Sequence, residues 1–173
     1  MNVELIRATI DDAQLLWEMQ IKSFQKLLDK YQDYETSPGN EPLNKTLNRL
    51  TQQNSYYYFI CMDNIKVGAV RVIDNHSEMR KKISPIFVLP EYQNKGIAQK
   101  ALTLCEQIHG THHWELDTIL QEKGNCYLYE KFGYRQTGKT EKVSPQTAKE
   151  VFRHSGASDG KCFAGIYDRR QSH

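Results

Sequence analysis

The stretch of the chain best suited to chemistry is a polar loop, Gln93-Asn94-Lys95-Gly96-Ile97-Ala98, between an apolar strand and a helix. The strand is predicted from Ile83 to Leu89 and stops at Pro90. The first turn of a helix has backbone N–H groups without intrahelical partners, and the helix dipole is positive there. Such a loop can hold a phosphate or pyrophosphate, and Gly96 lets the backbone approach the anion closely.

This loop does not identify a ligand when it is considered alone. It lacks the Gly-Lys-Ser/Thr ending of a nucleotide-binding P-loop, and its single glycine does not make the dinucleotide fingerprint. An ordinary turn from a strand into a helix is the alternative interpretation. The helix that follows has one apolar face, formed by Ala98, Ala101, Leu102, Cys105 and Ile108.

A second segment, Asn125 to Tyr134 (NCYLYEKFGY), follows about thirty residues after the loop. Together with Val88 to Leu102 (VLPEYQNKGIAQKAL), it resembles the two core motifs of the GNAT N-acetyltransferase superfamily. In that family the first motif binds the pyrophosphate of acetyl-coenzyme A, and the second places a tyrosine beside the thioester sulfur. The resemblance extends from Val3 to about Arg169 and implies acetyl-CoA as co-substrate, but it does not identify the acceptor.

The resemblance implies a role for each part of the loop and for the strand before it. The backbone N–H groups of Asn94, Lys95, Gly96, Ile97 and Ala98 would face the pyrophosphate, with the side chain of Gln93 or Lys95 assisting. A backbone N–H of Phe87 or Val88 would polarise the thioester carbonyl. One preorganised donor of this kind is worth roughly 2.7–4 kcal/mol where water is excluded.

Tyr129 matches the tyrosine of the second motif, which makes it the candidate general acid. A phenol with a pKa near 10 can donate a proton to a departing thiolate whose thiol has a pKa near 8.5. The alternative is a core aromatic residue beside Leu128 and Phe132. Asn125 lies one helical turn before Tyr129 and is a candidate cofactor contact. Many relatives have an asparagine seven residues before the tyrosine, but this chain has Glu122 at that position. A helix cap is the alternative role for Asn125.

The general base is less well defined by the sequence. Glu115 and Asp117 alternate with apolar residues in a predicted strand, so both lie on one side and could accept a proton directly or through water. They could instead bind a cationic group of the acceptor, or form a charge pair at an exposed edge. His76, in a polar connection, is a further candidate.

Two polar segments, Tyr31 to Pro42 and Ser144 to Gly160, are the expected source of acceptor recognition. In the first, Tyr31, Tyr34 and Glu35 could form an aromatic and acidic wall for a small amine. A solvated loop is the alternative interpretation of these three residues.

Length and composition limit the class of protein. A chain of 173 residues predicts one domain, residues 1–173, large enough to bury a core without disulfides or metal ions. The 23 basic and 21 acidic residues give a net charge of +2, too small for a nucleic-acid binder that neutralises phosphates. No apolar run approaches the ~20 residues that span a membrane, and no secretory signal is recognisable.

The cysteines and histidines predict neither disulfides nor a metal site. The four cysteines lie far apart in apolar runs and share no ligand spacing with the six histidines. Buried free thiols in a reducing cytoplasm are the expected state. The oligomeric state stays open, a homodimer included.

Periodicity and turn residues predict an α/β fold with a mixed central sheet of about seven strands and about four helices, and the GNAT resemblance implies that the sheet is mostly antiparallel. The predicted strands are 3–7, 55–62, 66–73, 83–89, 113–120, 134–143 and 161–169. The predicted helices are about 9–31, a short one containing Leu43, Leu47 and Leu50, one after Gly96, and 124–132, with one further helical turn at 146–152. By the resemblance, the two strands around the cofactor run parallel and splay apart, leaving a slot for the pantetheine arm.

The expected function is acetyl transfer from acetyl-CoA to a primary amine of a small molecule by direct attack on the thioester. Two alternatives are acetylation of a protein N-terminus or lysine, and a non-catalytic acyl-CoA-binding module. Tyr129 disfavours the last of these, because a binding module needs no acid beside the sulfur.

Overall fold

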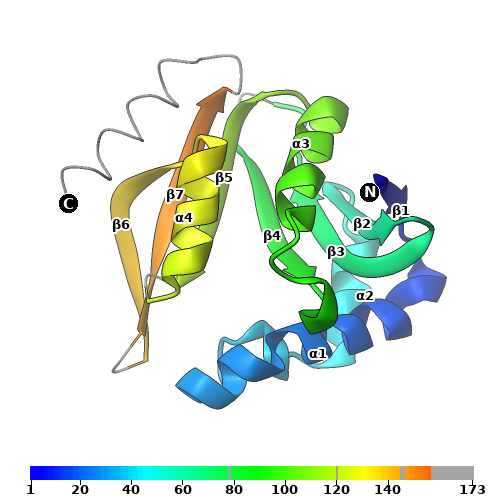
Figure 1. The fold of residues 1–173 in the computed structure, drawn as a ribbon, viewed down its shortest axis with the longest axis horizontal. Coiled ribbons are helices and arrows are strands. Elements are labelled where there is room, and N and C mark those ends of the chain that lie inside the picture. The colour runs from blue at the N-terminus through cyan, green and yellow to red at the C-terminus, as the bar shows by residue number, and fades with distance from the viewer. Residues whose placement is uncertain (78, 120, 145–146, 157–173) are drawn as a thin grey trace.

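A central mixed sheet organises the computed structural model, which describes residues 1–77, 79–119, 121–144 and 147–156 (Figure 1). Its seven strands have the order β1-β2-β3-β4-β5-β7-β6. The strands are β1 (Val3–Arg7), β2 (Ser55–Met62), β3 (Ile65–Ile73), β4 (Lys81–Val88), β5 (His112–Ile119), β6 (Arg135–Ser144) and β7 (Thr147–Gly156). The α-helices of the described residues are α1 (Ala13–Tyr31), α2 (Leu43–Thr51), α3 (Ile97–His109) and α4 (Lys123–Phe132). These elements confirm the predicted fold class.

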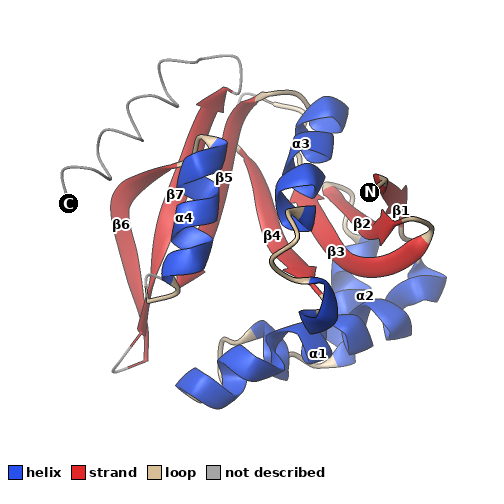
Figure 2. Cartoon of the chain, viewed as in Figure 1, coloured by secondary structure: helices blue, strands red, loops and turns tan. Residues whose placement is uncertain are grey.

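Helices cover both faces of the sheet (Figure 2). On one face, α3 and α4 pack through Ile97, Leu102 and Tyr129 onto the larger hydrophobic core. On the other face, Leu16 and Met19 of α1 pack onto a second core. The sheet is therefore buried on both sides, which explains the nearly continuous apolar runs of β2 and β3.

Local signals account for several element boundaries. Asp63 and Asn64 both have positive φ, 49° and 70°, and form the predicted tight turn between β2 and β3. At the end of α4, Gly133 has φ 115° and caps the helix. A Cβ at this position would lie 2.7 Å from Nε2 of His154, so the same glycine also allows β7 to pack closely.

The seventh strand is not the one that the sequence predicted. Residues 147–156 form β7, where a helical turn at 146–152 was expected, and the predicted closing strand 161–169 lies outside the described residues. The buried face of β7 consists of Glu150, Phe152 and His154. Because two of these three residues are polar, the sequence does not show the alternation of apolar and polar residues that is typical of a strand. Oε1 of Glu150 accepts a hydrogen bond of 2.7 Å from the backbone N–H of Gly138, which explains how this carboxylate is tolerated in the interior.

The buried face of α3 also differs from the prediction. Ile108 is 53% exposed, while Glu106 is buried. Oε1 of Glu106 lies 3.7 Å from Nε2 of His154, and both side chains are almost fully buried. Burial raises the pKa of Glu106 to about 7, with a small opposing effect from Lys81, and burial lowers the pKa of His154.

We expect this buried carboxyl group to make stability depend on pH. The folded-state pKa of about 7 lies above the unfolded value of 4.5, so the stabilising contribution is complete below pH 4.5 and disappears as the pH rises to about 7. At 1.36 kcal/mol per unit, the change is about 3 kcal/mol. Glu106→Gln should remove this change and unfold at a higher urea concentration than the parent at pH 8.

The matched control is Glu4→Gln, because Glu4 is exposed on β1. The difference in free energy of unfolding between parent and variant should grow from pH 5 to pH 8 for Glu106→Gln alone. Parallel pH profiles for the parent and Glu106→Gln would show that Glu106 titrates normally.

Candidate functional site

A slot between β4 and β5 organises the candidate site. The two strands are parallel neighbours at Lys81↔Trp114 and Lys82↔Glu115, and beyond these pairs they separate (Figure 1). The separation begins where the register of β4 against β3 shifts between Ile83 and Ile86. Buried Arg71 donates a 2.5 Å hydrogen bond from Nε to the carbonyl of Ser84 at this irregularity, which holds the bend in place.

The hydrogen-bond register decides which backbone groups of β4 face the slot. The N–H of Leu89 donates to the carbonyl of Val67 at 2.8 Å, so Leu89 and Phe87 direct their backbone groups toward β3. Val88 and Ile86 therefore direct theirs toward the slot. Of the two donors predicted for polarising a carbonyl, Val88 has the required direction, whereas the amide of Phe87 lies on the side of β3.

The loop before α3 presents its backbone N–H groups outward. Asn94 and Gly96 have positive φ, 63° and 77°, and in the described part of the chain no hydrogen-bond acceptor is found for the backbone N–H groups of Asn94 to Ala98. A Cβ built on Gly96 would meet nothing within 4 Å. These open N–H groups at the start of a helix of 13 residues form a cradle suited to an anion.

Side chains near the cradle take separate positions. Nε2 of Gln93 donates to the carbonyl of Val88 at 2.9 Å, so this side chain fixes the loop on the strand end instead of reaching outward. The ammonium group of Lys95 lies 5.7 Å from the ring centre of Tyr92, beside the loop. Ile97 is buried, so it can offer a ligand only its backbone.

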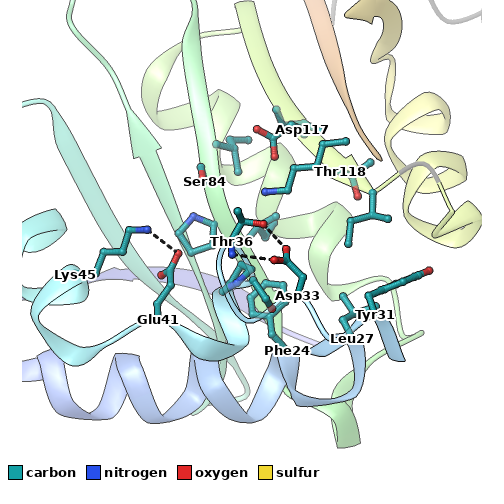
Figure 3. A pocket seen from close by; sticks show the side chains of 18 of the residues that line it. Phe24, Leu27, Tyr31, Asp33, Thr36, Glu41, Lys45, Ser84, Asp117 and Thr118 are labelled. Atoms are coloured by element: carbon teal, nitrogen blue, oxygen red, sulfur yellow. Dashed lines mark hydrogen bonds and ion pairs between the residues drawn. The ribbon is translucent and has the colours of Figure 1, made fainter. Parts of the chain in front are cut away.

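A cavity of about 390 Å³ lies at the other end of the slot (Figure 3). Its walls come from the end of α1 with the following loop, the start of α2, the bend of β4, the end of β5, α4 and β7. The polar and aromatic lining residues are Phe24, Tyr31, Asp33, Glu35, Thr36, Ser37, Glu41, Lys45, Arg49, Ser84, Asp117, Thr118, Tyr129 and Lys149.

Tyr129 lines this cavity from α4. It is 8% exposed, and its ring packs against Tyr134 and Phe152 with centre separations of 6.1 Å and 6.2 Å. Burial raises the pKa of Tyr129, and the carboxylate of Asp117 adds to the effect. The hydroxyl group therefore stays protonated at neutral pH and can donate a proton.

The structure separates the two carboxylates predicted as candidate bases. Oε2 of Glu115 accepts from Nε of Arg153 at 3.1 Å, and Glu115 is not among the residues that line the cavity. Asp117 lines the cavity and lies 3.7 Å from Nζ of Lys82. His76 is placed elsewhere, with Nε2 2.6 Å from the hydroxyl of Tyr56. Asp117 is therefore the predicted base that the geometry brings to Tyr129.

The acceptor wall predicted from the first polar segment is present in part. Tyr31 and Glu35 line the cavity, whereas Tyr34 is 58% exposed and is not a lining residue. The carboxylate of Asp33 bonds the backbone N–H and the hydroxyl of Thr36, and this tight turn directs Tyr34 outward.

A polar bridge joins the two sides of the cavity. The hydroxyl of Tyr31 donates to Oε2 of Glu122 at 2.5 Å, and Nζ of Lys30 donates to the same oxygen at 2.8 Å. Burial alone would raise the pKa of Glu122, but these two hydrogen bonds hold it below its usual value. Glu122, just before α4, thus attaches that helix to the end of α1. Asn125 lies within the first turn of α4 and does not line the cavity.

A cluster of charged residues, Glu41 before α2 and Lys45 and Arg49 within it, was not predicted from the sequence. Glu41 accepts hydrogen bonds from Arg49 at 2.7 Å and 3.0 Å and from Gln20 at 2.7 Å, and it lies 3.5 Å from Lys45. A carboxylate just before a helix, followed at four and eight residues by cations within that helix, was the available signal. It indicates a charge cluster but not that the cluster borders a cavity.

Comparison with known proteins identifies the family. The model of the acetyltransferase (GNAT) domain matches residues 28–145, which is more than half of the chain. The chain belongs to the GNAT acetyltransferase family. This membership confirms the resemblance that the two motifs indicated. No curated protein matches the chain in sequence.

Solved structures share this GNAT fold at low sequence identity. PaiA N-acetyltransferase from Thermoplasma acidophilum, in complex with coenzyme A, is 17% identical, with a TM-score of 0.69 over 90% of this chain and 99% of that one. A GNAT acetyltransferase from Elizabethkingia anophelis with acetyl-CoA bound is 16% identical, with a TM-score of 0.59 over 89% and 98%. The ribosomal-protein-S18-alanine N-acetyltransferase from Escherichia coli is 9% identical, with a TM-score of 0.68 over 92% and 97%.

The described residues also bear on the predictions about cysteines, metal sites and membrane-spanning helices. Cys61, Cys105 and Cys126 are buried thiols, as expected, and Cys162 lies outside the described part. Within that part, no group of three or more His, Cys, Asp or Glu side chains could hold a metal ion. None of the described helices combines the length and apolar character needed to cross a membrane.

Proposed function

We propose that this GNAT protein is an acetyl-CoA-dependent N-acetyltransferase that acts on a primary amine of a small molecule. The observation that carries the proposal is a slot with an open N–H cradle at one end and a cavity lined by Tyr129 and Asp117 at the other. Acetyl-CoA would supply an activated acetyl group, and the relatives solved with coenzyme A or acetyl-CoA support this choice.

Each residue has a defined task in the proposed reaction. The N–H groups of Asn94 to Ala98 bind the pyrophosphate, and the slot-facing N–H of Val88 polarises the thioester carbonyl. Asp117 accepts a proton from the attacking amine, directly or through water. Tyr129 donates its hydroxyl proton to the sulfur as the carbon–sulfur bond breaks, and a proton released by the amine restores the hydroxyl.

The shape of the cavity favours a small acceptor over a protein chain. The 33–38 segment and the bridge between Tyr31 and Glu122 border a pocket of about 390 Å³, within the range of small-molecule sites. A peptide acceptor would be expected to use an open groove. Three buried thiols also suit a reducing compartment, so we place the enzyme in the cytoplasm.

A screen for thiol release tests the function. The full chain is mixed with acetyl-CoA and panels of small amines, peptides with free N-termini and lysine peptides. Amine-dependent release of coenzyme A that favours small amines supports the proposal, and a preference for peptides contradicts it. Acetyl-CoA binding without release with any acceptor would instead support the binding-module alternative.

We expect Asp117→Asn to lower kcat/KM for the amine about tenfold at neutral pH, because water is the remaining proton acceptor. The loss should shrink as the pH approaches the amine's own pKa near 10, where less of the amine needs deprotonation. Glu115→Gln is the matched control, since its carboxylate lies two residues away on the same strand face and is paired with Arg153. Equal losses in both variants would remove the base role from Asp117.

A further inference from the structure

Lys149 enters the cavity from β7 and is not explained by the proposed reaction. It pairs in register with Ile119 of β5, so its side chain lies on the same face of the sheet as Asp117 and Ile119. On that face, Asp117 and Lys149 are diagonal neighbours on adjacent strands. Diagonal positions are about 7–8 Å apart, a distance that one small molecule can bridge.

The other cations of the cavity already have anionic partners. Arg49 is bonded twice to Glu41, and Lys45 lies 3.5 Å from the same carboxylate. Lys149 is half-buried and, although Glu141 of β6 is its register partner on the side away from the slot, no ion pair of Lys149 is found among the described residues. A half-buried ammonium group that makes no ion pair and borders a cavity can be stabilised by an anionic group of a ligand.

The carboxylates of the cavity favour a positive charge at a different place. Asp117 lies at the slot, where the attacking nitrogen must be, with the partly exposed ammonium group of Lys82 3.7 Å away, and Glu35 lies on the facing loop without a described partner. Positive and negative ligand groups are therefore favoured at separate positions of one cavity. An acceptor with positive groups alone would either bring a second positive group near Lys149, which is repulsive, or leave this lysine without an ion pair.

We propose that the acceptor is a compact zwitterion, an amine that also carries a carboxylate or phosphate group, and that Lys149 binds this anionic group. The inference rests on the proposed function, because it assigns the nitrogen end of the acceptor to Asp117 and Tyr129. Lys149 is then a specificity-determining residue. The acceptor lies along the face shared by β5 and β7, with its nitrogen toward the slot.

Matched acceptors test the proposal in the 173-residue chain. Each pair differs by the anionic group alone: L-lysine against cadaverine for a carboxylate, and phosphoethanolamine against ethanolamine for a phosphate. We expect at least one zwitterion to exceed its partner at least tenfold in kcat/KM, and the favoured pair identifies the anion. The opposite order in both pairs, or no preference in either, overturns the proposal.

Variants link the preference to the residue. Lys149→Met should abolish the preference for the zwitterion mainly through KM, and Lys149→Glu should reverse it toward the cation. Lys139→Met, at an exposed position on β6, is the control and should leave the preference unchanged. A preference that survives Lys149→Met would show that another group binds the anion.

Calorimetry separates this inference from the proposed function. If no acceptor is acetylated, the proposed function fails, and binding of the same four compounds to the protein with coenzyme A decides the inference. Lys149-dependent binding of a zwitterion alone would support it. Equal or absent binding of all four would overturn it.

Discussion

Replacing Tyr129 with phenylalanine is expected to lower kcat roughly 10²–10⁴-fold, the range in which a positioned general acid contributes. The variant keeps the ring that packs against Tyr134 and Phe152, so the free energy of unfolding should change little. The KM for acetyl-CoA should also stay nearly constant, because the cradle at Gly96 is separate from the hydroxyl group. Steady-state kinetics with saturating acceptor measure both quantities.

The choice of leaving group makes this test specific. A thioester of a more acidic thiol needs less help from a proton donor, so Tyr129→Phe should slow its reaction much less than that of acetyl-CoA. Tyr134→Phe is the control, since it removes a phenol hydroxyl from a neighbouring buried ring that does not line the cavity. Unchanged turnover in Tyr129→Phe would assign the proton to water.

Gly96→Ala should weaken productive use of acetyl-CoA by about 10²-fold in kcat/KM. A Cβ here meets no protein atom within 4 Å, so it projects into the open space over the N–H cradle where we place the pyrophosphate. A truncated donor, S-acetyl-pantetheine, lacks this anion and should react with parent and variant at similar rates. That comparison separates a damaged cradle from a damaged active site.

Gly138→Ala provides a matched control for backbone strain. Gly138 has φ 82° against 77° for Gly96, and a Cβ there also meets nothing within 4 Å. Both alanines carry the cost of a left-handed conformation, about 1–2 kcal/mol. Both variants should therefore melt at slightly lower temperatures, but only Gly96→Ala should lose affinity for coenzyme A in calorimetry. Equal affinities would show that the loop does not bind the diphosphate.

Local signals in the sequence were sufficient for much of this architecture. The turn at Asp63 and Asn64, the cap at Gly133 and the strand-to-helix loop at Gly96 depend on neighbouring residues alone, and the structure has all three. The splay of β4 and β5 was inferred from the family resemblance, since no local pattern specifies it.

The features that could not be predicted from the sequence depend on contacts between distant segments. The buried face of β7 contains Glu150 and His154, whose burial depends on partners in β6 and α3. Glu115 differs from Asp117 because its carboxylate is bonded to Arg153, a cross-strand partner that lies far away in the sequence. The choice between Phe87 and Val88 depends on the register against β3, which no sequence pattern gave. Lys149 was missed because its strand was not predicted.

The unpaired side of β4 has a consequence for how the protein behaves in solution. From Ser84 to Val88 this strand has β3 on one side, and no described strand bonds its other side. Open strand edges are templates for association between molecules, and here one lies within the sheet instead of at its margin. A pantetheine arm bonded along this edge would both cover it and raise the melting temperature in proportion to the logarithm of the coenzyme concentration. Purification and storage with coenzyme A should therefore suppress aggregation as well as stabilise the fold.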